Sequence, residues 1–263
     1  TETGRRPGVE HLAAIERIAP TLRALRHADG GLARFHGGGR GLDGRLDQAL
    51  ASSGVKPAAA MTGLAMGFAR LSGGRTSVIA DAASPPDGQA STSAHASTLA
   101  FELTSGRRAV IVSCGSGAPF GPDWRRAGRA TASHSTLEIE GFSSSRLGGG
   151  GHEQLTDRAR VPLAETVIDP SSARLEMSHE GWLSTHGLTH TRHLILAHDG
   201  RYLSGEDTLA AITPATRAKL RQILFRIMRE AGVVSADLFG EAIGQVAVAA
   251  GKGLFYRQLE MGI

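Results

Sequence analysis

The sequence predicts a mainly β protein: a β-sandwich with a helix on its N-terminal side and a helical hairpin on its C-terminal side. Between residues 31 and 212, short apolar runs alternate with Gly, Asp and Ser turns, which is typical of sandwiches. The 35 glycines among 263 residues exceed the usual share of about 7% and favour many tight turns. Helical spacing of apolar residues occurs near both ends. We therefore divide the chain into a helical segment (1–30), a β-sandwich domain (31–212) and a helical tail (213–263).

The N-terminal helix is expected between Val9 and Arg26. Its apolar residues recur at helical spacing, and they are Leu12, Ile15, Ile18, Leu22 and Leu25. Pro20 lacks a backbone donor and is expected to kink or split the helix. A short strand is expected at 32–35, followed by another short helix at 46–51.

The runs that predict strands become regular after Gly63. They cover residues 64–71, 76–80, 98–103, 108–113, 135–139, 161–167, 173–177, 188–196 and 202–204. Ser72-Gly73-Gly74-Arg75 separates the first two runs, and Asp199-Gly200 separates the last two. Both segments have the composition of hairpin turns, which supports the sandwich interpretation.

The character of the sequence changes at Thr213. Thr213 can cap a helix that begins at Pro214 and ends at Gly232, and Ser235 can cap a second helix. The first helix would have an apolar stripe of Leu220, Ile223, Leu224, Ile227 and Met228. The second would have one of Leu238, Phe239, Ala242, Ile243, Val246 and Ala250. We expect the two helices to pack on each other without completing the sandwich.

The charge pattern points to an anionic partner. The net charge is +4 and the pI is near 9.8, with the densest basic group at Arg125, Arg126 and Arg129. Nucleic-acid-binding domains usually carry a focused basic stripe, so nucleic acid is not an expected partner. An acidic polysaccharide suits these arginines because the guanidinium fork matches carboxylate and sulfate. A merely solvated basic surface is the alternative.

Simple patterns exclude several other classes of protein. A single cysteine rules out an intramolecular disulfide, and no run reaches the roughly 18 apolar residues of a membrane span. The glycine runs lack the strand-to-helix setting of a phosphate-binding loop. The chain starts without Met or a hydrophobic signal core, so we expect that it begins inside a longer protein or has lost a leader.

The most informative pattern is a set of spaced blocks between residues 88 and 142. The blocks are Ser93-Ala94-His95-Ala96-Ser97 with Phe101, then Ser113-Cys114-Gly115, then Ala132-Ser133-His134-Ser135-Thr136-Leu137. They resemble the C-terminal β-domain of heparinase II/III-like polysaccharide lyases. In that family, His-x-His-x-Asp-x-x-x-Phe is followed by Asp-x-Gly and then by Ala-x-His-(Asn/Ser)-Thr-(Leu/Val). The first and third blocks are recognisable here, and the middle block is degraded.

The resemblance implies a metal site with His95 and His134 as ligands, close in space on neighbouring strands. Ser113 stands where the family has an Asp ligand, and a hydroxyl is a poor zinc ligand. Cys114 could supply a thiolate instead, but adjacent strand residues point to opposite faces, so only one of the two can serve. We expect zinc to be bound weakly or not at all. The alternatives are a structural, hydrogen-bonded His95 and a Cys114 that is only a small buried apolar residue.

Other histidines are expected to have structural roles. His179 to Trp182, with His190 and Arg192, resembles a paired-strand block of the family. Trp182 should pack in the core, and Arg192 should pair with Glu180, Glu206 or Asp207. His36, beside Gly37, is expected in a surface loop, with a position facing the cleft as the alternative.

The resemblance implies β-elimination on an acidic, uronate-containing polysaccharide, and a periplasmic location. In the family, Tyr and His residues of a preceding α/α-toroid supply much of the base and acid. Segment 1–30 would be the end of such a toroid, so no catalytic residue can be assigned within this chain. We expect a fragment or truncated form of a lyase that is inactive in isolation, with Arg125, Arg126 and Arg129 binding the polysaccharide. The alternative is a non-catalytic carbohydrate-binding or structural β-sandwich module.

Overall fold

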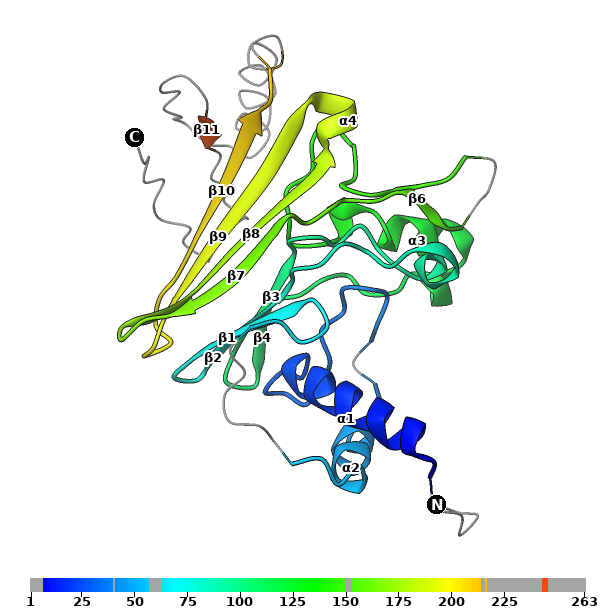
Figure 1. Ribbon diagram of the computed structural model, residues 1–263, viewed down its shortest axis with the longest axis vertical. Helices are drawn as coiled ribbons and strands as arrows, with labels where there is room; N and C mark the ends of the chain where they lie inside the picture. The colour runs from blue at the N-terminus through cyan, green and yellow to red at the C-terminus, as the bar shows by residue number, and fades with distance from the viewer. Residues whose placement is uncertain are drawn as a thin grey trace.

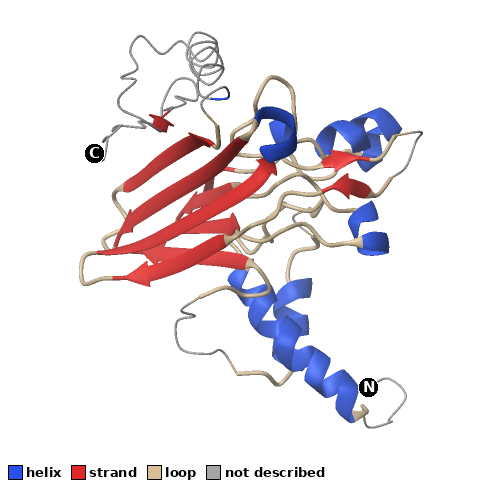
Figure 2. Cartoon of the chain, turned by 45° about the horizontal axis from the view of Figure 1, so that its top comes forward, coloured by secondary structure: helices blue, strands red, loops and turns tan. Residues whose placement is uncertain are grey.

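Two antiparallel sheets face each other in the computed structural model, which describes residues 7–39, 41–56, 63–149, 153–213, 216 and 243–245 (Figures 1 and 2). The first sheet has the order β1-β2-β3-β4 and the second has the order β11-β10-β9-β8-β7. The first consists of β1 (Phe68–Gly73), β2 (Thr76–Asp81), β3 (Phe101–Ser105) and β4 (Arg108–Ile111). The second consists of β7 (Leu163–Ile168), β8 (Ser172–Trp182), β9 (Leu188–Ala197), β10 (Leu203–Ala211) and β11 (Ile243–Gln245). The predicted mainly β fold is therefore confirmed.

The main core lies between the two sheets. Along β9, buried residues alternate with half-buried ones, as the period of two in a strand requires. The buried side chains come from both sheets: Leu71, Val78, Ala80, Phe101 and Leu103 from the first, and Leu175, Met177, Leu194 and Leu196 from the second. Each such large apolar side chain contributes about 1.5–3 kcal/mol when fully buried.

Two hairpin turns meet where the sheets close on each other. The turn between β1 and β2 is the predicted one, since Gly73 pairs with Thr76 across Gly74 and Arg75. A Cβ at Gly73 would overlap the Ala197 carbonyl, and one at Gly200 would overlap Gly73 itself. The Thr76 hydroxyl donates to the Gly200 carbonyl at 2.7 Å. Glycine is therefore required here because two backbones are in direct contact.

The N-terminal helices lie beside the first sheet (Figure 1). Helix α1 (Val9–Ala24) is continuous through Pro20, so the expected split does not occur. Helix α2 (Arg45–Ser52) is linked to the end of α1 by an ion pair between Arg26 and Asp47 at 2.8 Å. Four apolar side chains of α1 are exposed, namely Val9, Leu12, Ile15 and Ile18. Of these, Ile15 and Ile18 line a hollow between α1 and α2.

The β2–β3 connection and the chain between β4 and β7 form short elements and loops that carry the candidate site. In chain order they are η1 (Gly88–Thr92), η2 (Ala118–Phe120), α3 (Pro122–Gly128), η3 (Thr131–Ser133), β5 (Arg146–Leu147) and β6 (Leu155–Asp157). Helix α4 (Leu183–His186) joins β8 to β9. Figure 1 shows α3 and β6 together on one side of the sandwich.

Two predicted strands are wrong. Residues 32–35 make only a single bridge, between Arg26 and Leu32. The Arg34 amide donates instead to the Glu102 carboxylate, and Phe35 stacks on Phe68. Residues 135–139 also form no strand. Their apolar side chains, Leu137 and Ile139, pack in a second core around Trp182, so they are apolar because of packing and not because of strand pairing.

The predicted helical tail falls mostly outside the described residues. At its start, the Thr216 amide donates to the Thr213 hydroxyl at 3.1 Å, which is the expected capping bond. At Ile243–Gln245 the helix prediction is wrong, because these residues form β11, paired with Thr208–Ala210 of β10. The free edge of β10 offers backbone partners, which outweigh the helical periodicity of so short a segment.

Candidate functional site

His95 and His134 form a buried, hydrogen-bonded pair. His95 Nδ1 lies 3.1 Å from His134 Nε2, and the side chains are only 3% and 7% exposed. The predicted proximity is confirmed, but the placement on neighbouring strands is wrong: His95 follows η1 and His134 follows η3. The two loops are joined by their backbones, since the Ala96 amide donates to the Arg129 carbonyl. Thr131 completes the connection by donating its hydroxyl to the Ala96 carbonyl at 2.8 Å.

Both histidines are uncharged at neutral pH. Burial, reinforced by the neighbouring His134, His36 and Arg129, lowers the pKa of His95 to about 3. Burial and the nearby His36 lower the pKa of His134 to about 4. One neutral ring therefore donates its proton to the other. Among the described residues, His134 Nδ1 is buried and has no hydrogen-bond partner.

The residues around this pair do not fit a zinc site. Two nitrogens on one tetrahedral zinc would be about 3.3 Å apart, so the spacing of the pair alone is suitable. However, the described residues contain no group of three or more His, Cys, Asp or Glu side chains that could hold a metal ion. Ser113 is 1% exposed, and its hydroxyl has no partner within the described chain, whereas Cys114 is exposed. Ser113, which stands at the position of the third metal ligand, is thus buried, but its hydroxyl is a weak ligand for zinc.

Two buried carboxylates lie beside the pair, and no sequence motif predicted either of them. Glu102 accepts hydrogen bonds from the amides of Arg34 and Ser113 and lies 2.9 Å from His27 Nε2. Asp81 accepts from Ser97 at 2.6 Å and lies 3.5 Å from His36 Nε2. Burial raises the pKa of Asp81, while His36 and Ser97 oppose that effect.

His36 belongs to the site, in agreement with the alternative that placed it facing the cleft. Its Nδ1 accepts a hydrogen bond from the His95 amide at 3.2 Å. The next residue, Gly37, has φ +77°, and a Cβ there would lie 2.8 Å from His95 Nε2. Only glycine allows the 36–39 loop to approach the His95 ring so closely.

A second buried network positions both histidine loops. Arg192 donates to both carboxylate oxygens of Asp207, at 2.7 and 2.8 Å, as one of the three predicted pairings. Its Nη1 also donates to the carbonyls of Leu99 and Ser135, at 2.8 and 2.7 Å. These carbonyls belong to the loops that carry His95 and His134. One guanidinium in the sheet therefore fixes both loops.

Proton positions in this network follow from its hydrogen bonds. The Gly181 amide donates to His179 Nδ1, so neutral His179 carries its proton on Nε2. That proton is donated to His190 Nδ1, and His190 Nε2 then donates to Asp207 at 2.7 Å. Trp182 is fully buried beside both rings, as expected. The block is structural.

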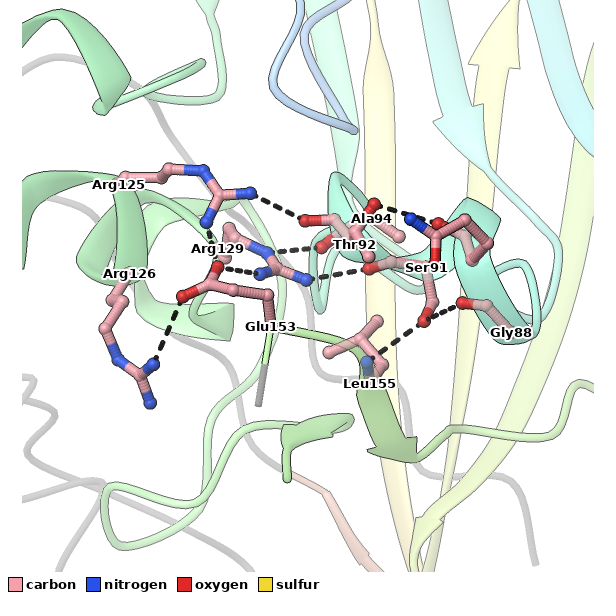
Figure 3. A network of polar contacts seen from close by, with 10 residues as sticks. Gly88, Ser91, Thr92, Ala94, Arg125, Arg126, Arg129, Glu153 and Leu155 are labelled. Atoms are coloured by element: carbon pink, nitrogen blue, oxygen red, sulfur yellow. Dashed lines mark hydrogen bonds and ion pairs between the residues drawn. The ribbon is translucent and has the colours of Figure 1, made fainter. Parts of the chain in front are cut away.

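The three predicted substrate-binding arginines converge on one carboxylate, Glu153 (Figure 3). Arg129 is 3% exposed and donates to the carbonyls of Ala94 and Ser91, both at 2.8 Å. Arg129 therefore holds the His95 loop in place. Burial, together with the positive charges of Arg125 and Arg126, lowers the pKa of Arg129 to about 10.

The fold and the site define a two-layer antiparallel β-sandwich domain with a buried histidine pair in its connecting loops. The chain belongs to the family described as Heparinase II/III-like, C-terminal, whose profile matches residues 55–250. A sequence relative is FtsZ-localized protein C of Caulobacter vibrioides (strain NA1000 / CB15N), 33% identical over 215 residues. That alignment covers 79% of this chain and 36% of the relative.

Solved structures share the fold at low identity. The heparan sulfate lyase HepC from Pedobacter heparinus superposes with a TM-score of 0.56 at 15% identity, covering 78% of this chain and 33% of HepC. A heparinase III structure superposes with a TM-score of 0.54 at 16% identity, covering 78% and 33% of the two chains. The chain thus spans about a third of the length of these relatives. Within the described residues, no helix is long and apolar enough to cross a membrane.

Proposed function

We propose that this chain is a non-catalytic module of a heparinase II/III-like protein, and that it binds an acidic polysaccharide without cleaving it. The observation that supports the absence of cleavage is the buried His95–His134 pair, in which Nδ1 of His95 is hydrogen-bonded to Nε2 of His134. β-Elimination needs a base for the proton beside the uronate carboxylate and an acid for the leaving oxygen. Efficient groups have pKa values near the working pH, and those of His95 and His134, about 3 and 4, are far below it.

Tyrosine does not supply the missing acid within the described chain. Tyr202 is half-exposed in the connection between β9 and β10, whereas the histidine pair lies in the loops between η1 and β5. Tyr256 lies outside the described residues. This arrangement supports binding without turnover.

The test is direct because elimination creates an unsaturated uronate that absorbs in the ultraviolet. Purified chain should give no absorbance rise with heparan-type, alginate-type or pectin-type polymers, and should retain a sulfated or uronate polymer in affinity electrophoresis. A rise that disappears in both His95→Ala and His134→Ala would overturn the non-catalytic assignment. Failure to retard any acidic polymer would overturn the binding assignment.

A lyase activity of the longer protein is the alternative, and the exposed face of α1 supports a helical neighbour. Val9, Leu12, Ile15 and Ile18 form an apolar stripe that is 37–83% exposed, and its Ile15 and Ile18 line a hollow shared with α2. Such a stripe normally packs on another helix. We propose that an α/α-toroid domain of the parent protein covers this face and brings the residues for acid–base chemistry. Expression with the upstream coding region, followed by the same ultraviolet assay, tests this.

A second proposal concerns cellular location and rests on the 33% identity to a protein named for its localisation with FtsZ. We propose that the parent protein of this chain also co-localises with FtsZ. Imaging a fluorescent fusion together with labelled FtsZ tests it. A distribution that does not change when FtsZ is depleted would contradict this second proposal without affecting the first.

A further inference from the structure

The arginine cluster is a ready-made anion site whose present occupant is part of the chain. Arg125 and Arg129 both contact Glu153 Oε2, the latter at 3.2 Å, and Arg126 lies 3.5 Å from Oε1 (Figure 3). One carboxylate therefore faces three guanidinium groups. The site has more positive charge than Glu153 can neutralise.

Two of the arginines are held in place independently of Glu153. Arg125 donates to the Thr92 carbonyl at 2.8 Å, and Arg129 donates to Ser91 and Ala94. The Arg129 side chain is only 2% exposed, so its charge is fixed and poorly solvated. Removing the Glu153 carboxylate would leave these two donors aimed at the same place. A preorganised cradle of this kind binds carboxylate or sulfate with little loss of side-chain freedom.

The Glu153 side chain can be displaced from the three arginines. It is 40% exposed. Within the described residues, the Glu153 carboxylate contacts the three arginines alone, whereas its neighbour Leu155 is anchored by donating its amide to Ser91 Oγ at 3.1 Å. The pairs with Arg125 and Arg126 are partly exposed, and water weakens such pairs, so an external anion can compete with the glutamate for these two arginines. The pair with buried Arg129 is stronger, so the displacing anion must replace it.

An exposed aromatic pair lies beside α3, the helix that carries Arg125 and Arg126, although Trp124 projects from a different face of that helix than these arginines. Trp124 precedes Arg125 on α3 and is 64% exposed, and Phe120 of η2 is 74% exposed. Their ring centroids are 6.3 Å apart. The pair has a rigid base, because η2 packs so tightly on α3 that a Cβ at Gly117 would overlap the Trp124 carbonyl. Exposed apolar patches mark interaction sites, and an aromatic face can pack against the C–H face of a sugar ring.

We propose that Glu153 is an internal stand-in for the anionic group of an acidic sugar chain. The ligand's carboxylate or sulfate displaces Glu153 from Arg125, Arg126 and Arg129, and the sugar chain extends from there over α3 toward Trp124. This inference rests on the proposed polysaccharide-binding function and adds its location and its regulation. Because the Glu153 carboxylate competes with the ligand for the three arginines, it lowers the affinity for any anion. A ligand with several anionic groups overcomes this competition better than one with a single charge.

The test compares Glu153→Gln with wild type in titrations with a sulfated heparin oligosaccharide, an oligogalacturonate and inorganic sulfate. Trp124 fluorescence reports binding, because Trp182 is buried and the chain has two tryptophans. Loss of competition from a partly exposed carboxylate should tighten oligosaccharide binding by about 3- to 30-fold. Adding Arg126→Gln to Glu153→Gln should abolish this gain. Glu176→Gln and Arg174→Gln, half-exposed residues on β8, are the charge-matched controls and should change little.

The outcomes separate this inference from the proposed function. If wild type binds the oligosaccharides and Glu153→Gln binds them no more tightly, the polysaccharide function stands and the displacement proposal fails. If Glu153→Gln gains affinity for inorganic sulfate alone, while no polymer binds either protein, Glu153 does guard an anion site but the sugar ligand is wrong. If Glu153→Gln lowers the melting temperature and anions do not restore it, Glu153 is a structural ion-pair partner and the proposal is overturned.

Discussion

At the scale of single residues, the neutral histidine pair makes stability depend on pH. The pKa values of His95 and His134 in the folded protein lie below the ordinary 6.5. Between those values and 6.5, the unfolded chain binds more protons, so the free energy of unfolding falls as the pH falls. Each pKa unit corresponds to about 1.4 kcal/mol, and the expected loss between pH 7 and pH 4 is a few kcal/mol.

His134→Gln should flatten this dependence. Denaturant titrations at pH 7.5, 6, 5 and 4 should show a smaller loss of unfolding free energy in the variant than in wild type. Buried His179 and His190, whose pKa values are also lowered, contribute a background with the same sign in both proteins. Equal slopes for variant and wild type would mean that the pair is not neutral in the folded state.

We predict that Ser113 limits metal binding at the histidine pair, because it stands where the family pattern has an Asp ligand. Ser113→Asp should create a zinc site, because a carboxylate would join the two imidazoles as a third ligand. Without zinc, the variant should be less stable than wild type, because the new carboxylate would be a second buried negative charge near Glu102. Glu102 lies close to this position, since it accepts a hydrogen bond from the backbone amide of residue 113. Elemental analysis and melting temperature, with zinc and with chelator, measure both effects.

Ser113→Asn is the control for size without charge and should bind no zinc. Stoichiometric zinc in wild type, lost in Cys114→Ser, would show that the exposed thiolate reaches the site. No zinc in Ser113→Asp would mean that position 113 does not face the imidazoles.

The sequence predicted the proximity of His95 and His134 because their motif blocks are distinctive. It did not predict Asp81 or Glu102, because each lies in an ordinary apolar strand and acts only through contacts with residues far along the chain. His36 was visible beside three glycines, but nothing local showed that the loop would close over His95. Long-range contacts of this kind have no signature in sequence periodicity.

At the scale of elements, the contact between the β1–β2 and β9–β10 turns ties the two sheets together. Gly73→Ala should destabilise the protein by about 1–3 kcal/mol, because the added methyl would overlap the Ala197 carbonyl and force the hairpins apart. Gly39→Ala is the matched control, since nothing lies within 4 Å of its Cβ position and its φ is not positive. Urea unfolding of both variants measures the difference, and equal stabilities would show that the turns separate without cost.

The strand predictions succeeded where hairpins are local and failed where packing decided the structure. Turns at Gly73-Gly74 and Asp199-Gly200 join sequential strands, so short-range patterns were sufficient. Residues 135–139 had the composition of a strand. However, the Ser135 carbonyl accepts a hydrogen bond from Arg192, and the apolar side chains of the segment pack around Trp182. Local composition could not distinguish a buried loop from a strand.

At the scale of the whole molecule, the sandwich should be independent of the C-terminal tail. The main core is built from β1–β4 and β7–β10, and the described part of the tail adds only the three-residue strand β11 to the edge of β10. Deleting residues 213–263 should therefore leave the strand signal in circular dichroism nearly unchanged and retain cooperative unfolding. A cooperative loss of the sheet signal would show that the tail is an integral layer of the fold.

The same deletion should reduce solubility, because it exposes the edge of β10 that β11 now covers. Thr208, Leu209 and Ala210 lose their backbone partners and become able to pair with the same edge of another molecule. Light scattering against concentration should reveal association in the truncated chain. Thr208→Lys in the truncated chain should restore a monomer, since a charged residue on an edge strand opposes pairing. Association that Thr208→Lys leaves unchanged would mean that a surface other than this edge is responsible, for which the exposed apolar face of α1 is the first candidate.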